Sequence, residues 1–445
     1  MARKKDAIIM VAAGMLKKKK EFINPDFESM YLNYGLLGLA TILYDKGYEN
    51  VQMFQGDYKP PASVLEEILK CGIDVKDIRF PVFVSVPSFF SVEWAQDFIQ
   101  QLKELNSGIL VVLGGRWVVD RNIEWIQQYI PEVDFVCRGC PDEIIDQLIY
   151  SENWERYSTM MSVKNVFSHF NYPLLNNFME YQPQVEISRG CPMQCEFCLE
   201  KNYDVSFVKS PQDVMLEIEE VMGYYKTSDL NFYFEAAMFN PTIEWATEFY
   251  NLYKEKNMGF HWRFESRVDT LDFEVMKILS KAGLKVIDLG LESASVIQLQ
   301  RMNKSANPKE YLERASQLIK VLHSVGIWAK LNILLYLGET KETINETIHW
   351  LDIHKKYIKG VSVNPFILYL DGDNTEQFLR HIENETKITP DIFLLSKQGY
   401  MYVDLSPEIS VEDAKKYSNY IADRYMSKED FLDLKKICYM KRSDR

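Results

Sequence analysis

The chain has no apolar run of 18 residues, and the lysine stretch at residues 17–20 follows only a short apolar segment. A membrane-spanning helix and a secretory signal are therefore not expected. Positive charge is also scarce, because 51 Lys and Arg stand against 64 Asp and Glu, which gives a net charge of −13. This excess of negative charge argues against nucleic-acid binding as the main function.

Internal repeats, low-complexity segments and a disulfide-like cysteine framework are missing as well. Three of the seven cysteines fall in one short motif, and the other four show no such framework. Free thiols in this number fit a reducing cytoplasm. The 445 residues are 47% hydrophobic and 26% charged, so the chain is long enough and apolar enough for two or three domains with a sizeable core.

The most informative segment holds Cys191, Cys195 and Cys198 in the spacing C-x₃-C-x₂-C. Three thiolates on one loop can hold a cubane iron–sulfur cluster by three of its four irons, which leaves the fourth iron open to a small ligand. The alternatives are three unrelated thiols or a zinc site completed by a distant histidine such as His169 or His261. Zinc loops usually add a second pair of Cys or His ligands, so the spacing favours the cluster.

The first 150 residues alternate short apolar runs with amphipathic stretches. Runs of this length are typical of buried parallel strands, and the stretches between them are typical of helices. Five such units in series predict an α/β domain with a doubly wound, Rossmann-like sheet over residues 1–150. The expected strands are 7–12, 51–54, 81–86, 109–113 and 133–136, and the expected helices are 36–46, 61–70, 92–105 and 122–129.

A second series of strands and helices covers residues 184–370 and predicts a six-fold partial β/α barrel. Ser210 followed by Pro211 predicts the start of its first helix. In such barrels the chemistry lies at the carboxyl ends of the strands, and the cysteine motif follows the first strand. Residues 151–183 are expected to form a linker that packs across both domains, and residues 371–445 a mostly helical region. The expected barrel strands are 184–188, 230–234, 260–264, 285–291, 329–337 and 361–370.

The cysteine spacing resembles the signature of the radical S-adenosylmethionine (SAM) superfamily, and the six-strand series resembles its usual core. This resemblance implies a 4Fe–4S cluster on Cys191, Cys195 and Cys198 whose open iron holds the amino and carboxylate groups of SAM. It implies a one-electron cleavage of the SAM sulfonium to a 5′-deoxyadenosyl radical, with an electron donor such as flavodoxin or ferredoxin. The resemblance assigns no catalytic residue that acts on the substrate.

Several segments resemble those that surround SAM in this superfamily. Glu292, within the run 289–293 and followed by Met302 and Lys304, would face the SAM ribose or methionyl group; the alternative is an acceptor at the start of the next helix. Glu235 ends the second strand where a carboxylate often binds the SAM amino group, although the neighbouring glycines are missing.

Three further residues complete this expected SAM-binding set. Arg267 resembles the arginine of an R-x-D segment and would pair with the SAM carboxylate, or form a surface salt bridge with Asp269. Asn332, with the run 338–340 that follows its strand, resembles the segment beside SAM on the fifth strand. Phe197 would pack near the cluster and the adenine, or would simply belong to the core.

The first domain resembles the cobalamin-binding domain that precedes the barrel in one class of the superfamily. Ser85, Pro87 and Ser88 fall where a serine-bearing loop contacts the cobalamin tail. Gly114 and Gly115 fall where two glycines allow the backbone a close approach to cobalamin. The resemblance therefore implies cobalamin as a further cofactor.

One departure concerns cobalt. The loop that supplies a histidine to the metal is absent, and no histidine precedes His169. Bound cobalamin would thus receive no imidazole ligand from this domain. The alternative is a degenerate domain that binds no cobalamin. Cys137 and Cys140 form a C-x₂-C pair, which we interpret as buried thiols rather than a metal site.

The resemblance implies a cobalamin-dependent radical SAM enzyme, a methyltransferase that methylates an unactivated carbon of a small molecule or a peptide natural product. One alternative keeps the radical SAM barrel and performs a rearrangement, an epimerisation or a bond formation without methylation. Another is a non-catalytic iron–sulfur partner protein. The identity of the substrate is not implied.

Overall fold

We describe the fold from a computed structural model of the chain. The chain divides into two compact units, with residues 1–25 and 29–181 in unit 1 and residues 26–28 and 182–445 in unit 2. The cysteine motif lies in unit 2. The residues that the structure describes are 4–15, 31–118, 123–157, 167–198, 200–201, 203–369, 375–387, 389–391, 395 and 400–438.

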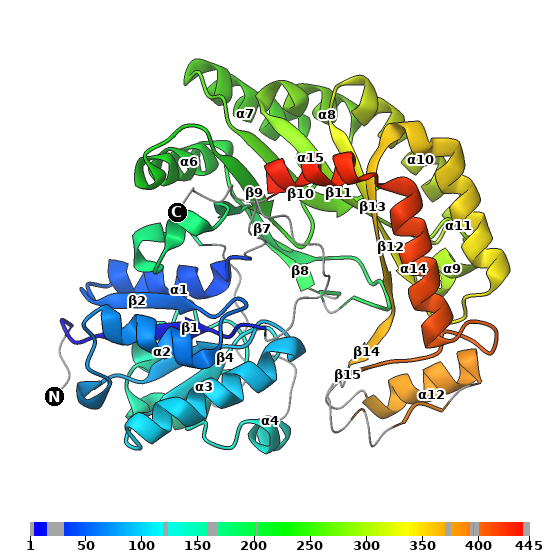
Figure 1. Ribbon diagram of the computed structural model, residues 1–445. Helices are drawn as coiled ribbons and strands as arrows, with labels where there is room; N and C mark the ends of the chain where they lie inside the picture. Colours follow the sequence, from blue (N-terminus) through cyan, green and yellow to red (C-terminus); the bar gives the residue numbers. More distant parts are fainter. Residues whose placement is uncertain are drawn as a thin grey trace. The chain divides into compact units, whose positions relative to one another are not determined.

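Unit 1 is built on a five-stranded parallel sheet in the order β2-β1-β3-β4-β5, which confirms the expected doubly wound fold (Figure 1). Alternate side chains of each strand point to opposite faces, and α2, α3 and α4 cover one face with apolar residues. The strands are β1 Ile8–Ala12, β2 Val51–Gln55, β3 Val82–Ser85, β4 Val111–Gly114 and β5 Phe135–Val136, and the main helices are α1 Tyr34–Asp45, α2 Pro61–Lys70, α3 Val92–Leu105, α4 Ile123–Tyr129 and α5 Ile145–Leu148.

The strand order of unit 1 reverses between β1 and β3. In open α/β sheets a ligand crevice forms at such a switch point, outside the carboxyl ends of the strands. Ser85 is the last residue of β3 and Gly114 the last residue of β4. The residues expected to contact cobalamin therefore lie at the edge where this fold binds ligands.

Residues 167–181, which we expected to form part of a linker across both domains, pack within unit 1. The backbone N–H of Asn176 donates to the carbonyl oxygen of Met53 on β2, at 2.8 Å. Tyr172 and Leu175 are buried, and the Tyr181 hydroxyl donates to Asp57. Their aromatic and aliphatic side chains extend the core of unit 1.

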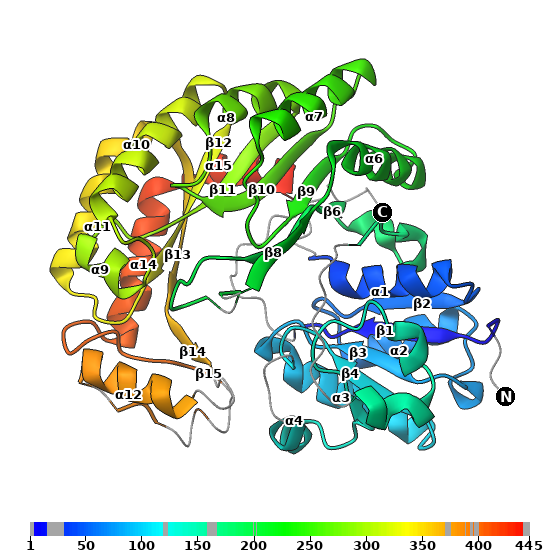
Figure 2. The ribbon, with the colours of Figure 1, turned by 180° about the vertical axis from the view of Figure 1, so that it is seen from behind.

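Unit 2 is built on a six-stranded parallel sheet in the order β13-β12-β11-β10-β9-β6, which confirms the six strands of the expected partial barrel. The helices between the strands line the outer side of the curved sheet (Figures 1 and 2). The strands are β6 Gln184–Glu186, β9 Asn231–Glu235, β10 His261–Arg267, β11 Leu284–Glu292, β12 Trp328–Leu335 and β13 Ile358–Pro365, and the helices are α6 Pro211–Tyr225, α7 Ile243–Glu255, α8 Phe273–Leu279, α9 Val296–Arg301, α10 Pro308–Ser324 and α11 Lys341–His354.

The alternation along β10 explains how the barrel separates its two faces. Trp262 and Phe264 are fully buried, and the Trp262 ring stacks on Phe234 of β9 with ring centroids 4.2 Å apart. Arg263 and Arg267 occupy the intervening positions and point to the inner face, because strand side chains alternate. The aromatic positions form the core against the helices, and the charged ones line the inside of the barrel.

A buried ionic group links three strands on this inner face. Arg263 Nη1 lies 3.1 Å from Asp288 Oδ2 of β11, and Lys330 of β12 pairs with the other oxygen of that carboxylate. Two cations therefore neutralise one fully buried acid, which lowers the pKa of Asp288 in spite of its burial. The group lies deeper in the barrel than Arg267.

The C-terminal region belongs to unit 2. Helix α15, Lys428–Cys438, contacts β9, β10, β11 and β13, and Lys359 near the start of β13 lies 2.9 Å from Asp430. The expected sixth strand ran to residue 370, whereas β13 ends at Pro365, which lacks a backbone N–H. A separate two-stranded antiparallel sheet pairs β14 Ile367–Tyr369 with β15 Tyr400–Tyr402. The remaining helices described in this unit include α12 Thr375–Thr386 and α14 Val411–Tyr425.

In the described parts of both units, no helix has the length and apolar character needed to cross a membrane.

Candidate functional site

The cysteine motif begins on a hairpin that the sequence did not predict. Strand β7, Ser188–Cys191, pairs antiparallel with β8, Tyr203–Val208, so Cys191 ends a strand and Cys195 and Cys198 lie in the segment that follows it. Arg189 makes two contacts with Glu186, at 2.6 and 3.0 Å. The hairpin thereby attaches the cysteine segment to the first barrel strand.

A second element clamps the cysteine segment from the side of β11. The backbone N–H of Glu196 donates to Met302 O at 2.9 Å, and Asn303 Nδ2 donates to Gln194 O at 2.9 Å. Asn303 adopts a left-handed backbone conformation with a φ of 48°, which Asn tolerates better than most residues. Residues 302–304, which the sequence flagged only by resemblance, are therefore the structural support of the motif.

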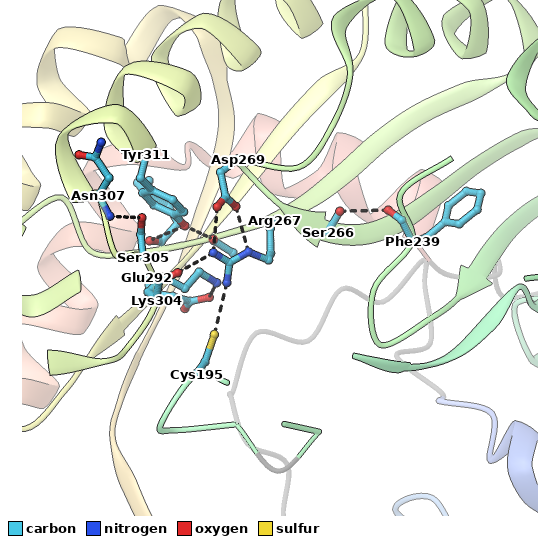
Figure 3. Close-up of polar contacts among 12 residues, drawn as sticks. Cys195, Phe239, Ser266, Arg267, Asp269, Glu292, Lys304, Ser305, Asn307 and Tyr311 are labelled. Atoms are coloured by element: carbon cyan, nitrogen blue, oxygen red, sulfur yellow. Dashed lines mark hydrogen bonds and ion pairs between the residues drawn. The ribbon is translucent and has the colours of Figure 1, made fainter. Parts of the chain in front are cut away.

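Arg267, the last residue of β10, points toward Cys195 of the same segment (Figure 3). Its Nη1 lies 3.3 Å from the sulfur of Cys195, and its Nη2 donates to Lys304 O at 2.5 Å. Its Nε and Nη2 each lie 2.9 Å from an oxygen of Asp269. The structure thus gives the bidentate partner of Arg267 as Asp269, and the pair is largely buried, where we had expected a surface salt bridge as the alternative.

Glu292 folds back over the end of β11. It has a positive φ of 65°, and its Oε1 lies 3.0 Å from Lys304 Nζ. A Cβ at Gly290 would lie 2.6 Å from that carboxylate oxygen, so the glutamate side chain lies directly over this glycine. Ser295 occupies the N-cap position of helix α9 without a side-chain capping hydrogen bond, and the contact that the structure shows for Glu292 is the one with Lys304.

Asn332 shares a row of the sheet with this group. It is paired in register with Gly290 of β11, which is paired with Arg267 of β10. Side chains in register on parallel strands point to the same face, so Asn332 faces the interior beside Glu292. Its amide makes no hydrogen bond within the described residues, and it is half-buried. A polar group of this kind is available to a ligand.

Phe197 lies above the carboxyl end of β12. Its ring centroid is 6.3 Å from that of Tyr336, and Lys304 Nζ is 5.8 Å from the Phe197 ring. Tyr336 in turn packs edge-on against Phe366, with centroids 5.1 Å apart. The aromatic side of the site is therefore formed by residues that lie far apart in the sequence.

Glu235 ends β9 on the other side of Arg267. Burial raises its pKa to about 8, although Arg263 opposes the shift; the charges of Glu265 and Glu186 add to it. The three carboxylates come from adjacent strands, with Glu186 and Glu235 in register. Glu265 was not predicted from the sequence. The alternation of Arg263, Glu265 and Arg267 along β10 is the signal that could have indicated it.

The described residues contain no group of three or more His, Cys, Asp or Glu side chains placed to hold a single metal ion. Three thiolates that each bind a different iron of a cubane do not have to converge on one point. His261, named for the zinc alternative, is the first residue of β10, whereas the cysteine segment meets the last. Six residues of strand, roughly 20 Å, separate the two ends.

The edge expected to bind cobalamin in unit 1 contains two glycines whose surroundings differ. A Cβ at Gly115 would lie 2.6 Å from the backbone nitrogen and oxygen of Val86, and the φ of Gly115 is 101°. A Cβ at Gly114 would meet nothing closer than 3.8 Å. Gly115 is thus required by the fold of unit 1 itself, whereas Gly114 leaves its surroundings open.

The serine-bearing loop of unit 1 lies next to these glycines. Ser85 is buried, and its hydroxyl accepts a hydrogen bond from Asn33 Nδ2 at 3.1 Å. Pro87 is exposed and Ser88 is half-buried. The backbone N–H of Val86 donates to Gly114 O at 2.8 Å, which ties the loop to the glycine edge.

Cys137 and Cys140, which we expected to be buried thiols, differ from one another. Cys137 is buried, and burial raises the pKa of its thiol to about 12. Cys140 is exposed, so that half of the expectation is wrong. Gly139 between them has a φ of 99°, and this turn carries Cys140 outward.

Residues 185–351 match the family model described as the radical SAM superfamily. The matched range runs from β6 through α11 and includes the cysteine segment. Over residues 185–351 of unit 2, this match confirms the resemblance to the radical SAM superfamily seen in the sequence.

A curated relative and two solved structures extend this comparison. The anaerobic magnesium-protoporphyrin IX monomethyl ester cyclase of Rubrivivax gelatinosus is 27% identical over 245 residues, which are 52% of this chain and 40% of the relative. The chain thus spans less than half of that protein's length. The radical SAM methyltransferase TsrM of Kitasatospora setae, solved with tryptophan and a SAM analogue, has a TM-score of 0.59 at 14% identity, over 84% of this chain and 76% of that one.

The cobalamin-dependent radical SAM enzyme OxsB, solved with aqua-cobalamin, has a TM-score of 0.66 at 12% identity, over 94% of this chain and 66% of that one. At such identities the likeness establishes the fold alone. It covers most of the chain, so an α/β unit with a doubly wound sheet together with a unit built on a six-stranded parallel sheet matches the fold of these enzymes.

Proposed function

We propose that the chain is a cobalamin-dependent radical SAM enzyme that methylates an unactivated carbon of a small molecule or a peptide. When bound, the cluster with SAM supplies radical hydrogen abstraction, and cobalamin supplies the methyl group. An external one-electron donor of the flavodoxin or ferredoxin kind is part of this proposal.

The observation that carries the proposal is the placement of the cysteine segment. It lies at the carboxyl ends of parallel strands, where β/α barrels perform chemistry, and Arg267, Met302 and Asn303 hold it there. All seven thiols of the chain are free of disulfides. Three thiols on one clamped segment fit a cubane cluster with one open iron.

The residues around this segment supply the groups that SAM requires. We propose that Glu292 and Asn332 bind the ribose or methionyl group, that Glu235 accepts from the SAM ammonium, and that Phe197 packs against the adenine. A carboxylate accepts strongly from hydroxyl and ammonium donors. Lys304 orients the Glu292 carboxylate from one side, at 3.0 Å, and leaves its second oxygen for a ligand.

Unit 1 fits a cobalamin tail at the edge of Ser85, Pro87, Ser88, Gly114 and Gly115. Open space at Gly114 permits close approach of a ligand to the backbone. TsrM has been solved with cobalamin and a 4Fe–4S cluster bound, on the same fold. This edge would hold the cofactor without a histidine, since none precedes His169.

A second candidate function is radical SAM chemistry without methylation, such as a ring closure. It is favoured by the curated relative, which is a cyclase and is matched over about half of this chain. The relative's own substrate is not carried over, because the chain spans only 40% of it.

The test is anaerobic reconstitution of the full chain with iron, sulfide and hydroxocobalamin. The proposal predicts about four irons per chain, a bound-cobalamin spectrum after desalting, and SAM cleavage on reduction. Iron and SAM cleavage without cobalamin uptake would favour the second candidate. Iron without any SAM cleavage would favour a non-catalytic iron–sulfur protein.

A further inference from the structure

We propose that Arg267 is a positioning residue that raises the reduction potential of the cluster through a hydrogen bond to the Cys195 thiolate. The inference rests on the proposed function, because it requires a cluster on the three cysteines.

The first step is the asymmetry among the three cysteines. Cys195 is buried and lies 3.3 Å from Arg267 Nη1. Cys198 is half-exposed, and among the residues that the structure describes its sulfur accepts only the backbone N–H of Glu200, at 3.4 Å. Within the described residues Cys191 has no hydrogen-bond donor. One cluster thiolate out of three would therefore receive a charged donor.

The second step is the fixed direction of that donor. Asp269 holds Nε and Nη2 of Arg267 at 2.9 Å each, and Lys304 O accepts from Nη2 at 2.5 Å (Figure 3). These contacts occupy the far edge of the guanidinium and leave Nη1 for the sulfur. A planar, always charged fork held in this way loses little freedom when it donates to a thiolate.

The third step is the effect on an electron. Hydrogen bonds to the cluster sulfurs and the local charge are among the factors that set the potential of an iron–sulfur cluster. An electron that enters the cluster increases the negative charge on the thiolates, so a guanidinium in contact with one of them stabilises the reduced form. Asp269 opposes this effect only partly, because it lies behind the guanidinium rather than against the sulfur.

The chain offers a matched control on the same strand. Arg263 lies four residues earlier on β10, points to the same inner face and is equally buried. Its Nη1 contacts Asp288 at 3.1 Å, and its guanidinium lies 3.7 Å from the centre of the Tyr233 ring. In the described part of the chain no hydrogen bond joins Arg263 to a cysteine of the motif, so Arg263→Gln removes the same charge without removing a bond to sulfur.

The experiment is a redox titration of the reconstituted full chain, followed by electron paramagnetic resonance of the reduced cluster. In Arg267→Gln we expect the reduction equilibrium to become at least tenfold less favourable, a fall of about 59 mV for one electron. Arg267→Lys, which keeps a charged donor, should lie between Arg267→Gln and the wild type. Arg263→Gln should stay within a factor of two of the wild-type equilibrium.

The outcomes separate the two proposals. A wild-type chain that takes up no iron would end the proposed function. A wild type with about four irons whose potential is unchanged in Arg267→Gln, or falls equally in Arg263→Gln, would overturn the role of Arg267 alone. If Arg267→Gln does not retain the cluster, Arg267→Lys decides, and a potential equal to that of the wild type would contradict the inference.

Discussion

Each unit places its candidate residues at the carboxyl edge of its own parallel sheet, but the contacts that fix these residues differ in kind. In unit 2, side chains bond across elements, as Arg267 does with Cys195, 72 residues away in the chain. In unit 1, the corresponding edge is mostly backbone, with Val86 bonded to Gly114. Side-chain contacts can be tested by substitutions that remove the contacting groups. An edge formed by backbone atoms is tested by substitutions that add a side chain at a glycine.

The largest expected effect is on the side-chain edge. Replacing Cys191, Cys195 and Cys198 together with alanine should remove all iron and the visible absorbance of the cluster, because no other ligand group is present among the described residues. Iron analysis of the reconstituted chain is the measurement. Alanine at Cys137 and Cys140 serves as the control and should leave the iron content unchanged; about four irons in the triple variant would disprove the cluster assignment.

The backbone edge predicts a difference between two neighbouring glycines. Gly114→Leu should abolish cobalamin uptake and leave the iron content and the unfolding temperature near the wild-type values, because a Cβ there has open space. Gly115→Leu should also destabilise unit 1 by at least about 1–3 kcal/mol, since its φ of 101° disfavours a side chain and its Cβ meets Val86. Cobalamin absorbance after desalting and circular dichroism melting separate the two effects.

A result in which both glycine variants bind cobalamin like the wild type would remove this edge from the proposed site. If instead both variants lose stability equally, the difference in backbone space that we describe would be wrong.

A smaller effect is expected at the side chains of unit 2 that we propose to bind SAM. Glu292→Gln keeps a partner for Lys304 but removes the charge that would accept from SAM, and such charge-assisted contacts contribute ~1.5–3 kcal/mol. SAM affinity should fall by roughly one to two decades, as measured by equilibrium dialysis, with the cluster intact. Asn332→Ala should cost less, about one decade or below, because its contact is neutral.

Two outcomes would count against this set. SAM binding equal to that of the wild type in both variants would return Glu292 and Asn332 to a structural role. A larger loss in Asn332→Ala than in Glu292→Gln would reverse the order that we assign to a charged and a neutral contact.

The smallest effect concerns the buried carboxyl group of Glu339 in unit 2. Among the described residues it has no ion pair like the one between Glu292 and Lys304. Burial raises the pKa of Glu339 to about 8, although hydrogen bonding by Thr343 and the charge of Arg301 oppose the shift. Between pH 4.5 and 8 the unfolded chain has lost this proton and the folded chain has kept it. The free energy of unfolding therefore falls as the pH rises through that window.

Glu339→Gln lacks this titration, so its free energy of unfolding relative to the wild type should increase from pH 5 to pH 8. Urea denaturation at both pH values measures the change. Glu342→Gln, an exposed change on α11, is the control and should show no such trend. An equal difference at both pH values would mean that Glu339 is ionised in the folded protein.

Much of the fold could be predicted from the sequence because its signals are local. The helices α2 and α3 have the expected bounds, since amphipathic periodicity and turn residues mark both ends. Ser210 accepts the N–H of Asp213 as the expected cap of α6. The hairpin β7–β8 was missed, because the cysteine segment separates its strands and neither strand has a strong alternation of its own.

The sequence alone determined the cysteine motif, the two β/α series and the sheet edges at which the candidate residues lie, because the spacing of ligand residues and the hydrophobic period are properties of neighbouring residues. The tertiary structure decided the partners: Asp269 and Cys195 for Arg267, Lys304 for Glu292, and Val86 for Gly115. These contacts join residues on different elements, and a guanidinium or carboxylate has several possible partners. Only the packing of strands and loops selects which of them comes within bonding distance.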